Sequence, residues 1–274
     1  MLKFAANLSM RYPELPFEAR FAAARADGFD GVEFLFPYAY TPQALAAQLK
    51  QHQLQQVLFN APPGGETPAA MAAAWDAGQR GTLALPGAQA AFEAGIHQAL
   101  HYAQALQCPR IHVMAGAVPA DADRQALTAL VIQRLRWAAA LAAPLGIKLL
   151  IEPINGRDMP GYFLQQQAHA HAIVQAVGSG QVQVQMDLYH AQIVEGDVSH
   201  KLRQYLPTGR VGHLQIASVP DRHEPDGGEL DYRWLFAELE KLGWDGWIGC
   251  EYRPAGGAAP GATSAGLAWR TALA

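Results

Sequence analysis

Short apolar runs alternate with longer segments of helical period along most of the chain. Runs rich in branched and aromatic residues have the length of strands, and they fall at 3–8, 31–36, 54–60, 110–116, 147–152, 182–187, 211–217 and 246–251. Apolar residues at every third or fourth position predict the helices between them, at 15–28, 41–53, 88–107, 122–146, 163–178, 189–206 and 232–243. Gly196 lies inside one of these segments, and we expect that helix to break there.

This strict alternation favours a parallel sheet whose strands are joined by crossover helices. Eight repeats of about 31 residues match the size of a (β/α)8 barrel. A doubly wound open sheet is the rival, but the chain contains neither GxGxxG nor GxxxxGK[ST]. We therefore predict a single-domain α/β protein, a (β/α)8 TIM barrel over residues 1–254, followed by an Ala/Gly/Pro-rich tail at 255–274.

Residues 61–86 interrupt this rhythm. The segment is rich in Pro, Gly and Ala, and it predicts a long loop with a short helix around 69–75. Loops of this length inside one domain are usually functional. We interpret the tryptophans of the chain, Trp75 among them, as packing residues.

Composition narrows the classes of partner. The chain has 274 residues, of which half are hydrophobic and 16% are charged, with a net charge of −4. It has no basic run, which argues against a nucleic-acid-binding surface but not against a small anionic ligand. Cys108 and Cys250 lack the spacing of a metal site. The chain has no signal-like segment and no apolar stretch of 18 residues, so we expect a cytoplasmic location and no membrane partner. The Ala-rich helices allow a homo-oligomer without requiring one.

Polar residues gather at the predicted strand ends, where barrel enzymes have their active sites. Glu152, Asp187, Gln215 and Glu251 follow one another at intervals of 35, 28 and 36 residues, about one β/α unit each. Four oxygen donors on consecutive strands would meet at one rim, and three carboxylates there would repel one another without a cation. The spacing therefore predicts a site for a hard divalent cation, Mg²⁺ or Mn²⁺.

Other polar residues near the strand ends are candidates for binding a substrate. They are Asn7, Asn60, His112, His190 and Arg222. His112 and His213 also fit the pattern of buried, hydrogen-bonded core histidines, and Glu33 fits either a ligand contact or a structural role. For Arg222, the alternative is a loop salt bridge to Asp221 or Glu224.

Several long motifs resemble the hydroxypyruvate isomerase family of xylose-isomerase-like TIM barrels. They are FAANLSM at 4–10, FDGVEFLFPY at 29–38, LLIEPINGRDMPGYFL at 149–164, QMDLYHAQIVEGD at 185–197 and VGHLQIASVPDRHEPDGGELDY at 211–232. The resemblance implies a metal held by Glu152, Asp187, Gln215 and Glu251, with substrate contacts from His190 and Arg222. Members of that family have a compact loop after the third strand, so the long segment 61–86 is a departure that bears on substrate preference.

The resemblance implies an isomerase that interconverts hydroxypyruvate and tartronate semialdehyde through an enediolate. Glu152 and Glu251 would then be the acid/base pair, and Arg222 would bind the substrate carboxylate. A 2-oxo-tetronate isomerase and a ketose 3-epimerase are the alternatives on the same barrel. A metal-dependent nuclease would need more histidines and a basic groove, and a non-catalytic sensor would bind the ligand without turnover.

Overall fold

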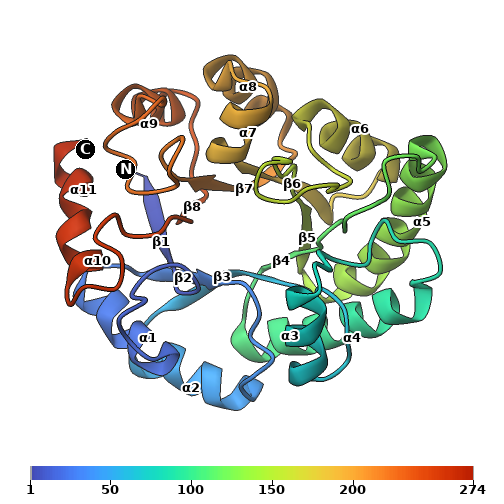
Figure 1. Cartoon of the computed structure of the whole chain (residues 1–274), viewed down its shortest axis with the longest axis horizontal. Coiled ribbons are helices and arrows are strands. Elements are labelled where there is room, and N and C mark those ends of the chain that lie inside the picture. Colours follow the sequence, from blue (N-terminus) through green and yellow to red (C-terminus); the bar gives the residue numbers. More distant parts are fainter. Residues whose placement is uncertain (1, 274) are drawn as a thin grey trace.

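Eight parallel strands close into a barrel surrounded by helices in the computed structural model, which describes residues 2–273 (Figure 1). The strands are β1 (Lys3–Asn7), β2 (Gly31–Phe34), β3 (Gln55–Asn60), β4 (Arg110–His112), β5 (Lys148–Ile151), β6 (Val182–Asp187), β7 (Val211–Ile216) and β8 (Trp247–Cys250). Each strand pairs in parallel with the next, and β1 closes the barrel on β8. The predicted (β/α)8 fold is thus confirmed.

The strands are joined by helices, most of which pack an apolar face on the outside of the barrel. They are α1 (Phe17–Ala26), α2 (Pro42–Gln51), α3 (Pro68–Asp76), α4 (Gln89–Leu106), α5 (Arg124–Ala142), α6 (Gln167–Val177), α7 (Leu188–Val194), α8 (Val198–Tyr205) and α9 (Tyr232–Lys241). Of these, α3 lies at the rim of the barrel. By length and composition alone, Arg124–Leu145 could cross a membrane. Its buried residues Leu127, Val131 and Leu135 belong to the core of the barrel, which accounts for its apolar character.

The amino-terminal end of the barrel is filled by side chains. Trp247 packs so closely on Gly31 that a Cβ at Gly31 would lie 2.7 Å from the indole ring. Ala5, Val57, Leu58 and Leu150 form a small buried cluster against which Trp247 packs. Because this end is occupied by packing, the open end is the one formed by the carboxyl ends of the strands.

Several predicted elements are shorter than the sequence pattern suggested. β4 ends at His112 instead of continuing to 116, because Ala115 forms an isolated bridge with Gly81 and the Gly116 carbonyl accepts the Phe163 N–H. α6 begins at Gln167 instead of 163, since Phe163 is held by this bond outside the helix. Apolar residues here serve the rim loops as well as the regular elements.

Two irregular segments were predicted correctly. The expected break at Gly196 separates α7 from α8, and Gly196 has φ +64. The expected short helix within 61–86 is α3, which begins after Thr67, whose side chain accepts the Ala70 N–H.

The carboxyl-terminal tail folds against the barrel instead of extending from it. It contains α10 (Ala262–Ala265), a 3-10 turn and α11 (Trp269–Ala272), which lie beside α1 (Figure 1). Trp269 is buried, its ring packs edge-on against Phe4 with centroids 5.1 Å apart, and its Nε1 donates to the Tyr252 hydroxyl at 2.8 Å. The tail is therefore joined to the residue that follows Glu251.

Candidate active site

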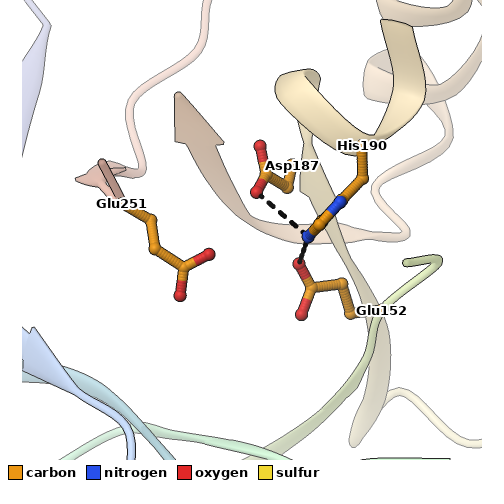
Figure 2. A group of neighbouring side chains, drawn as sticks. All are labelled: Glu152, Asp187, His190 and Glu251. Carbon is orange, nitrogen blue, oxygen red and sulfur yellow. Dashed lines mark ion pairs between the residues drawn. The ribbon is translucent and has the colours of Figure 1, made fainter. Parts of the chain in front are cut away.

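Three acidic side chains and one histidine converge at the carboxyl-terminal rim of the barrel. Glu152 follows β5, Asp187 ends β6, His190 lies in the first turn of α7 and Glu251 follows β8. One ligand atom from each lies within 4.8 Å of the others. Figure 2 shows Glu251 facing the other three side chains across a small space. All four side chains are buried, so the cluster lies in the interior of the folded protein and not on its surface.

The transition from β6 into α7 places two of these groups. Asp187 is both the last residue of β6 and the N-cap of α7, and its Oδ1 accepts the Tyr189 N–H at 2.8 Å. Because the helix begins immediately, His190 lies one turn away and its Nε2 is 3.6 Å from Asp187 Oδ2. The same Nε2 is 3.9 Å from Glu152 Oε1.

Asn155 fixes the orientation and tautomer of His190. The Asn155 side-chain oxygen accepts the Asp158 N–H at 2.8 Å, which turns its amide nitrogen toward His190 Nδ1 at 2.6 Å. Nδ1 therefore accepts, and the neutral ring carries its proton on Nε2, facing the carboxylates. Burial and the nearby Arg222 charge lower the pKa of His190 well below its usual value, which agrees with a neutral ring.

The acidic groups are strongly perturbed by one another and by burial. Desolvation, with the charges of Glu251 and Asp187, raises the pKa of Glu152 well above its usual value. Burial raises the pKa of Asp187 to about 6 and that of Glu251 to about 8. Among the described residues, no hydrogen bond reaches Glu152 Oε1 or Asp187 Oδ2. Buried carboxylate oxygens left without a donor fit the ligand preferences of a hard divalent cation.

Arg222 lies against this cluster, held by the loop after β7. Its Nη2 is 2.6 Å from Glu251 Oε2 and 3.6 Å from Asp187 Oδ2, and its Nη1 is 3.1 Å from Asp158 Oδ2. The guanidinium also lies 4.7 Å from the centre of the Tyr189 ring. These ion pairs replace the salt bridge to Asp221 or Glu224 that the sequence left open.

Glu33 is the centre of a hydrogen-bonded network beside the cluster. Its Oε1 accepts from Asn7 Nδ2 at 3.0 Å and from Gln215 Nε2 at 2.8 Å, and its Oε2 lies 2.7 Å from His213 Nε2. Asn7 Nδ2 is also 3.3 Å from Glu251 Oε1, which links the network to the cluster. The structure thus gives both Glu33 and His213 hydrogen-bonded structural positions.

Gln215 is the predicted ligand whose amide is already bonded on both sides. Besides the bond to Glu33, its Oε1 accepts from Gln185 Nε2 at 2.6 Å. A carbonyl oxygen has a second lone pair, so this bond is compatible with a ligand role. Its place in the ligand set stays a prediction, and His190 is the group that the structure places beside the three carboxylates.

A cavity of about 920 Å³ opens above the cluster. Its walls include Asn60 and His112, which were predicted to bind substrate, and His112 Nδ1 lies 3.4 Å from Glu152 Oε2. Burial lowers the pKa of His112 to about 3, so the ring is neutral. Asn7 is the predicted substrate-binding residue that the structure places in the Glu33 network instead of on the cavity wall.

Sequence reasoning assigned no site role to several residues of the site, and it interpreted one of them, Trp75, as a packing residue. Asn155 and Asp158 lie in the loop directly after Glu152, and Trp75 and Arg80 enter the cavity from the long segment 61–86. The length of that segment had indicated function, and the motif around Glu152 contained the other two. Neither signal said which side chain would point inward.

Comparison with known proteins gives a consistent picture. A family model described as a xylose isomerase-like TIM barrel matches residues 21–273. A 2-oxo-tetronate isomerase of Cupriavidus necator is 54% identical over 98% of this chain and 97% of its own. A hydroxypyruvate isomerase of Escherichia coli is 39% identical, covering 98% of each chain. A crystal structure from Brucella melitensis, named AP endonuclease, family 2, superposes with a TM-score of 0.91 and 47% identity over 99% of both chains.

Proposed function

This chain belongs to the xylose isomerase-like TIM barrel family and is an isomerase, and on that premise we propose that it isomerises a small hydroxy-keto acid. The observation that carries the proposal is the buried cluster in which Glu152 and Glu251 face one space from different strands. Moving a proton between adjacent carbons requires a group that removes it and a group that returns it. Two carboxyl groups on opposite walls can do both.

The donor set of the cluster fits Mg²⁺ or Mn²⁺, which Glu152, Asp187 and Glu251 would hold together with Gln215. Such an ion, when bound, would stabilise the negative charge that develops on the substrate oxygens. Arg222 offsets part of the negative charge of Glu251 and Asp187. His190, held as a neutral donor by Asn155, would hydrogen-bond to a substrate oxygen.

The proton balance of the proposed reaction is simple. Hydroxypyruvate becomes tartronate semialdehyde when C3 loses a proton, C2 gains one, and the hydroxyl proton moves from the oxygen on C3 to that on C2. One glutamate takes the C3 proton as a carboxylate, and the other gives a proton to C2 from its acid form. In the cation-free cluster, burial and mutual repulsion raise the pKa of both Glu152 and Glu251, so the pair favours holding a proton. The reverse reaction exchanges the two roles.

A four-carbon substrate is the second candidate. The cavity of about 920 Å³ has room for more than a three-carbon acid, and the relative from Cupriavidus necator is named a 2-oxo-tetronate isomerase. The same pair of glutamates would serve this acid, because the extra carbon lies beyond the two that exchange a proton.

Proton NMR in D₂O tests the proposal directly. The purified chain is incubated with hydroxypyruvate, with 2-oxo-tetronate and with a neutral ketose, each with Mg²⁺ or Mn²⁺ and then with EDTA. We expect an isomeric product and deuterium at the exchanging carbon for at least one acid. Both signals should be lost with EDTA and in Glu152→Gln and Glu251→Gln.

Glu66→Gln is the matched control, because Glu66 is an exposed glutamate outside the cavity. It should retain the activity of the unmodified chain. Turnover of ketoses alone would favour a 3-epimerase. Binding of the acids without exchange or product would contradict the proposed reaction and indicate a sensor.

A further inference from the structure

The carboxylate of a hydroxy-keto acid needs a cationic partner, and Arg222 is poorly placed to be the only one. Its Nη1 and Nη2 already pair with Asp158 and Glu251, and Asp187 lies 3.6 Å away. A substrate carboxylate at Arg222 would meet the repulsion of these three acidic groups. A second cation on the cavity wall would hold the substrate without that cost.

Arg80 is a cation on that wall without an acidic partner. Its Nη1 donates to the backbone carbonyls of Trp75 at 2.6 Å and of Gln79 at 3.1 Å, and its guanidinium lies 4.1 Å from the centre of the Trp75 ring. Within residues 2–273, no carboxylate forms an ion pair with it, and it lines the cavity. Its remaining N–H groups are available to a ligand.

The segment that carries Arg80 is fixed to the barrel. The Trp75 ring packs edge-on against Phe36 with centroids 5.2 Å apart. Gly81 bridges to Ala115, and its N–H donates to the Pro63 carbonyl at 3.1 Å. Gly81 has φ +116, and a Cβ there would lie 2.1 Å from the Met114 carbonyl oxygen, so only glycine allows this close approach. Arg80 is thus positioned before any ligand arrives.

Arg80 and the acidic cluster line the same cavity, and Glu251 is the member of the cluster that comes from the far side of the barrel. Arg80 is held above β3 and β4, whereas Glu251 and Arg222 come from β8 and the loop after β7, four strands further around the closed barrel. Figure 1 shows α3, which carries Trp75, across the barrel axis from α9. A small acid could therefore place its reacting carbons at the cluster and its carboxylate toward Arg80.

We propose that Arg80, held by Trp75, binds the substrate carboxylate and selects acids over neutral sugars of the same length. This inference rests on the proposed function for its substrate class. It also assigns a role to the segment 61–86, the part of the chain in which the sequence departs from the compact loop of the family it resembles.

The first test compares Arg80→Met and Arg80→Lys with the unmodified chain. Hydroxypyruvate and 2-oxo-tetronate serve as acids, and dihydroxyacetone and erythrulose as neutral substrates. Loss of a hydrogen-bonded charge pair should raise the KM for the acids about 10- to 100-fold in Arg80→Met, with kcat changed less than about threefold. The KM of Arg80→Lys for the acids should lie between those of the unmodified chain and Arg80→Met, because lysine keeps the charge but not the planar guanidinium. Values for the neutral substrates should not change.

Two matched arginines serve as controls. Arg136 also donates to two backbone carbonyls, those of Ala176 and Val177, but lies outside the cavity, so Arg136→Met should leave every KM unchanged. Arg253 is an exposed cation that also lines the cavity. If Arg253→Met loses the preference for acids and Arg80→Met keeps it, the assignment to Arg80 is wrong. Equal losses on acids and neutral substrates in Arg80→Met would indicate a structural role instead.

Calorimetry with glycerate and glycerol separates this inference from the proposed function. Glycerate carries the carboxylate but no carbonyl, so its binding does not depend on turnover. Binding of glycerate that weakens about 10-fold or more in Arg80→Met supports the role of Arg80 even if no keto acid is isomerised. Isomerisation of hydroxypyruvate with unchanged KM and unchanged glycerate affinity in Arg80→Met would overturn it while the proposed function stood.

Discussion

The guanidinium of Arg222 and the carboxylate of Glu251 are joined at 2.6 Å between Nη2 and Oε2, and Arg222 Nε also lies 3.4 Å from the Glu251 backbone carbonyl. The Arg222 carbonyl in turn accepts the Arg253 N–H at 3.0 Å. These contacts join the loop after β7 to the end of β8. The arginine therefore acts as an internal cation of the acidic cluster, and its removal should leave the carboxylates of that cluster without a positive partner.

Arg222→Met should destabilise the cation-free protein by about 3 kcal/mol at pH 8, because it leaves buried carboxylates without their positive partner. The loss should shrink at pH 5, where those carboxylates take up protons. Urea unfolding of both proteins in EDTA at the two pH values measures this. An equal loss at both would mean that packing on Tyr189, and not charge, is what the arginine supplies.

The stability of the cation-free protein should fall between about pH 6.5 and 8. The pKa of Glu251 is raised to about 8, so the folded state keeps a proton that the unfolded state has released. Each such proton contributes up to about 1.4 kcal/mol per pH unit. Below about pH 6.5 the unfolded state protonates His112 and His190, whose folded pKa values are lowered, and this opposes the trend.

The free energy of unfolding, measured in EDTA at steps of about half a pH unit, checks whether stability falls with rising pH as expected. Saturating Mn²⁺ should flatten the decline, because a bound cation favours the charged carboxylates. Stability that is constant or rises over this window in EDTA would contradict the perturbed carboxyls.

Glu33→Gln should lower the free energy of unfolding by about 2 kcal/mol and the affinity for Mn²⁺ about 10-fold. Glu33 accepts hydrogen bonds from Asn7 and Gln215 and pairs with His213, and an amide cannot accept in every one of these directions. Urea unfolding and a Mn²⁺ titration followed by electron paramagnetic resonance measure both effects, with Glu66→Gln as the control. Unchanged Mn²⁺ affinity would show that the network does not orient the cluster.

Asn155→Ala should lower kcat about 10- to 100-fold while leaving the barrel folded. The amide holds His190 with its Nε2 proton toward the carboxylates, and without it the ring can turn or change tautomer. Steady-state kinetics with circular dichroism as a fold check measure the effect. Full activity in this variant would show that the reaction does not depend on the orientation of His190 by Asn155.

Trp269→Ala should destabilise the chain by about 3 kcal/mol, because it empties a buried site against Phe4 and removes the donor to Tyr252. Thermal unfolding measures the loss. Exposed Trp234 offers the matched control, and Trp234→Ala should cost much less. A loss in Trp269→Ala as small as that expected for Trp234→Ala would mean that the tail contributes little to the folded barrel.

The barrel and the meeting of its carboxylates followed from the sequence. Parallel strands of a closed barrel must end at one rim, so the three carboxylates were expected to lie near one another once the strands were placed. Asp187 follows Glu152 by one β/α unit, and Glu251 follows Asp187 by two. Strand lengths were less predictable, because apolar residues such as those at 113–116 pack equally well in a strand or in a rim loop.

The sequence by itself determined the barrel architecture and the acidic character of its rim. The spacing of apolar residues and the polar residue at the end of each strand are local properties of the chain. Only the tertiary structure decided how the rim side chains are partnered. His190 joins the cluster because α7 begins directly after Asp187. Arg222 pairs with Glu251 and Asp158 because of its loop conformation, and Arg80 reaches the cavity because Gly81 is bound to Ala115. Each depends on contacts between segments far apart in the chain, which no local pattern encodes.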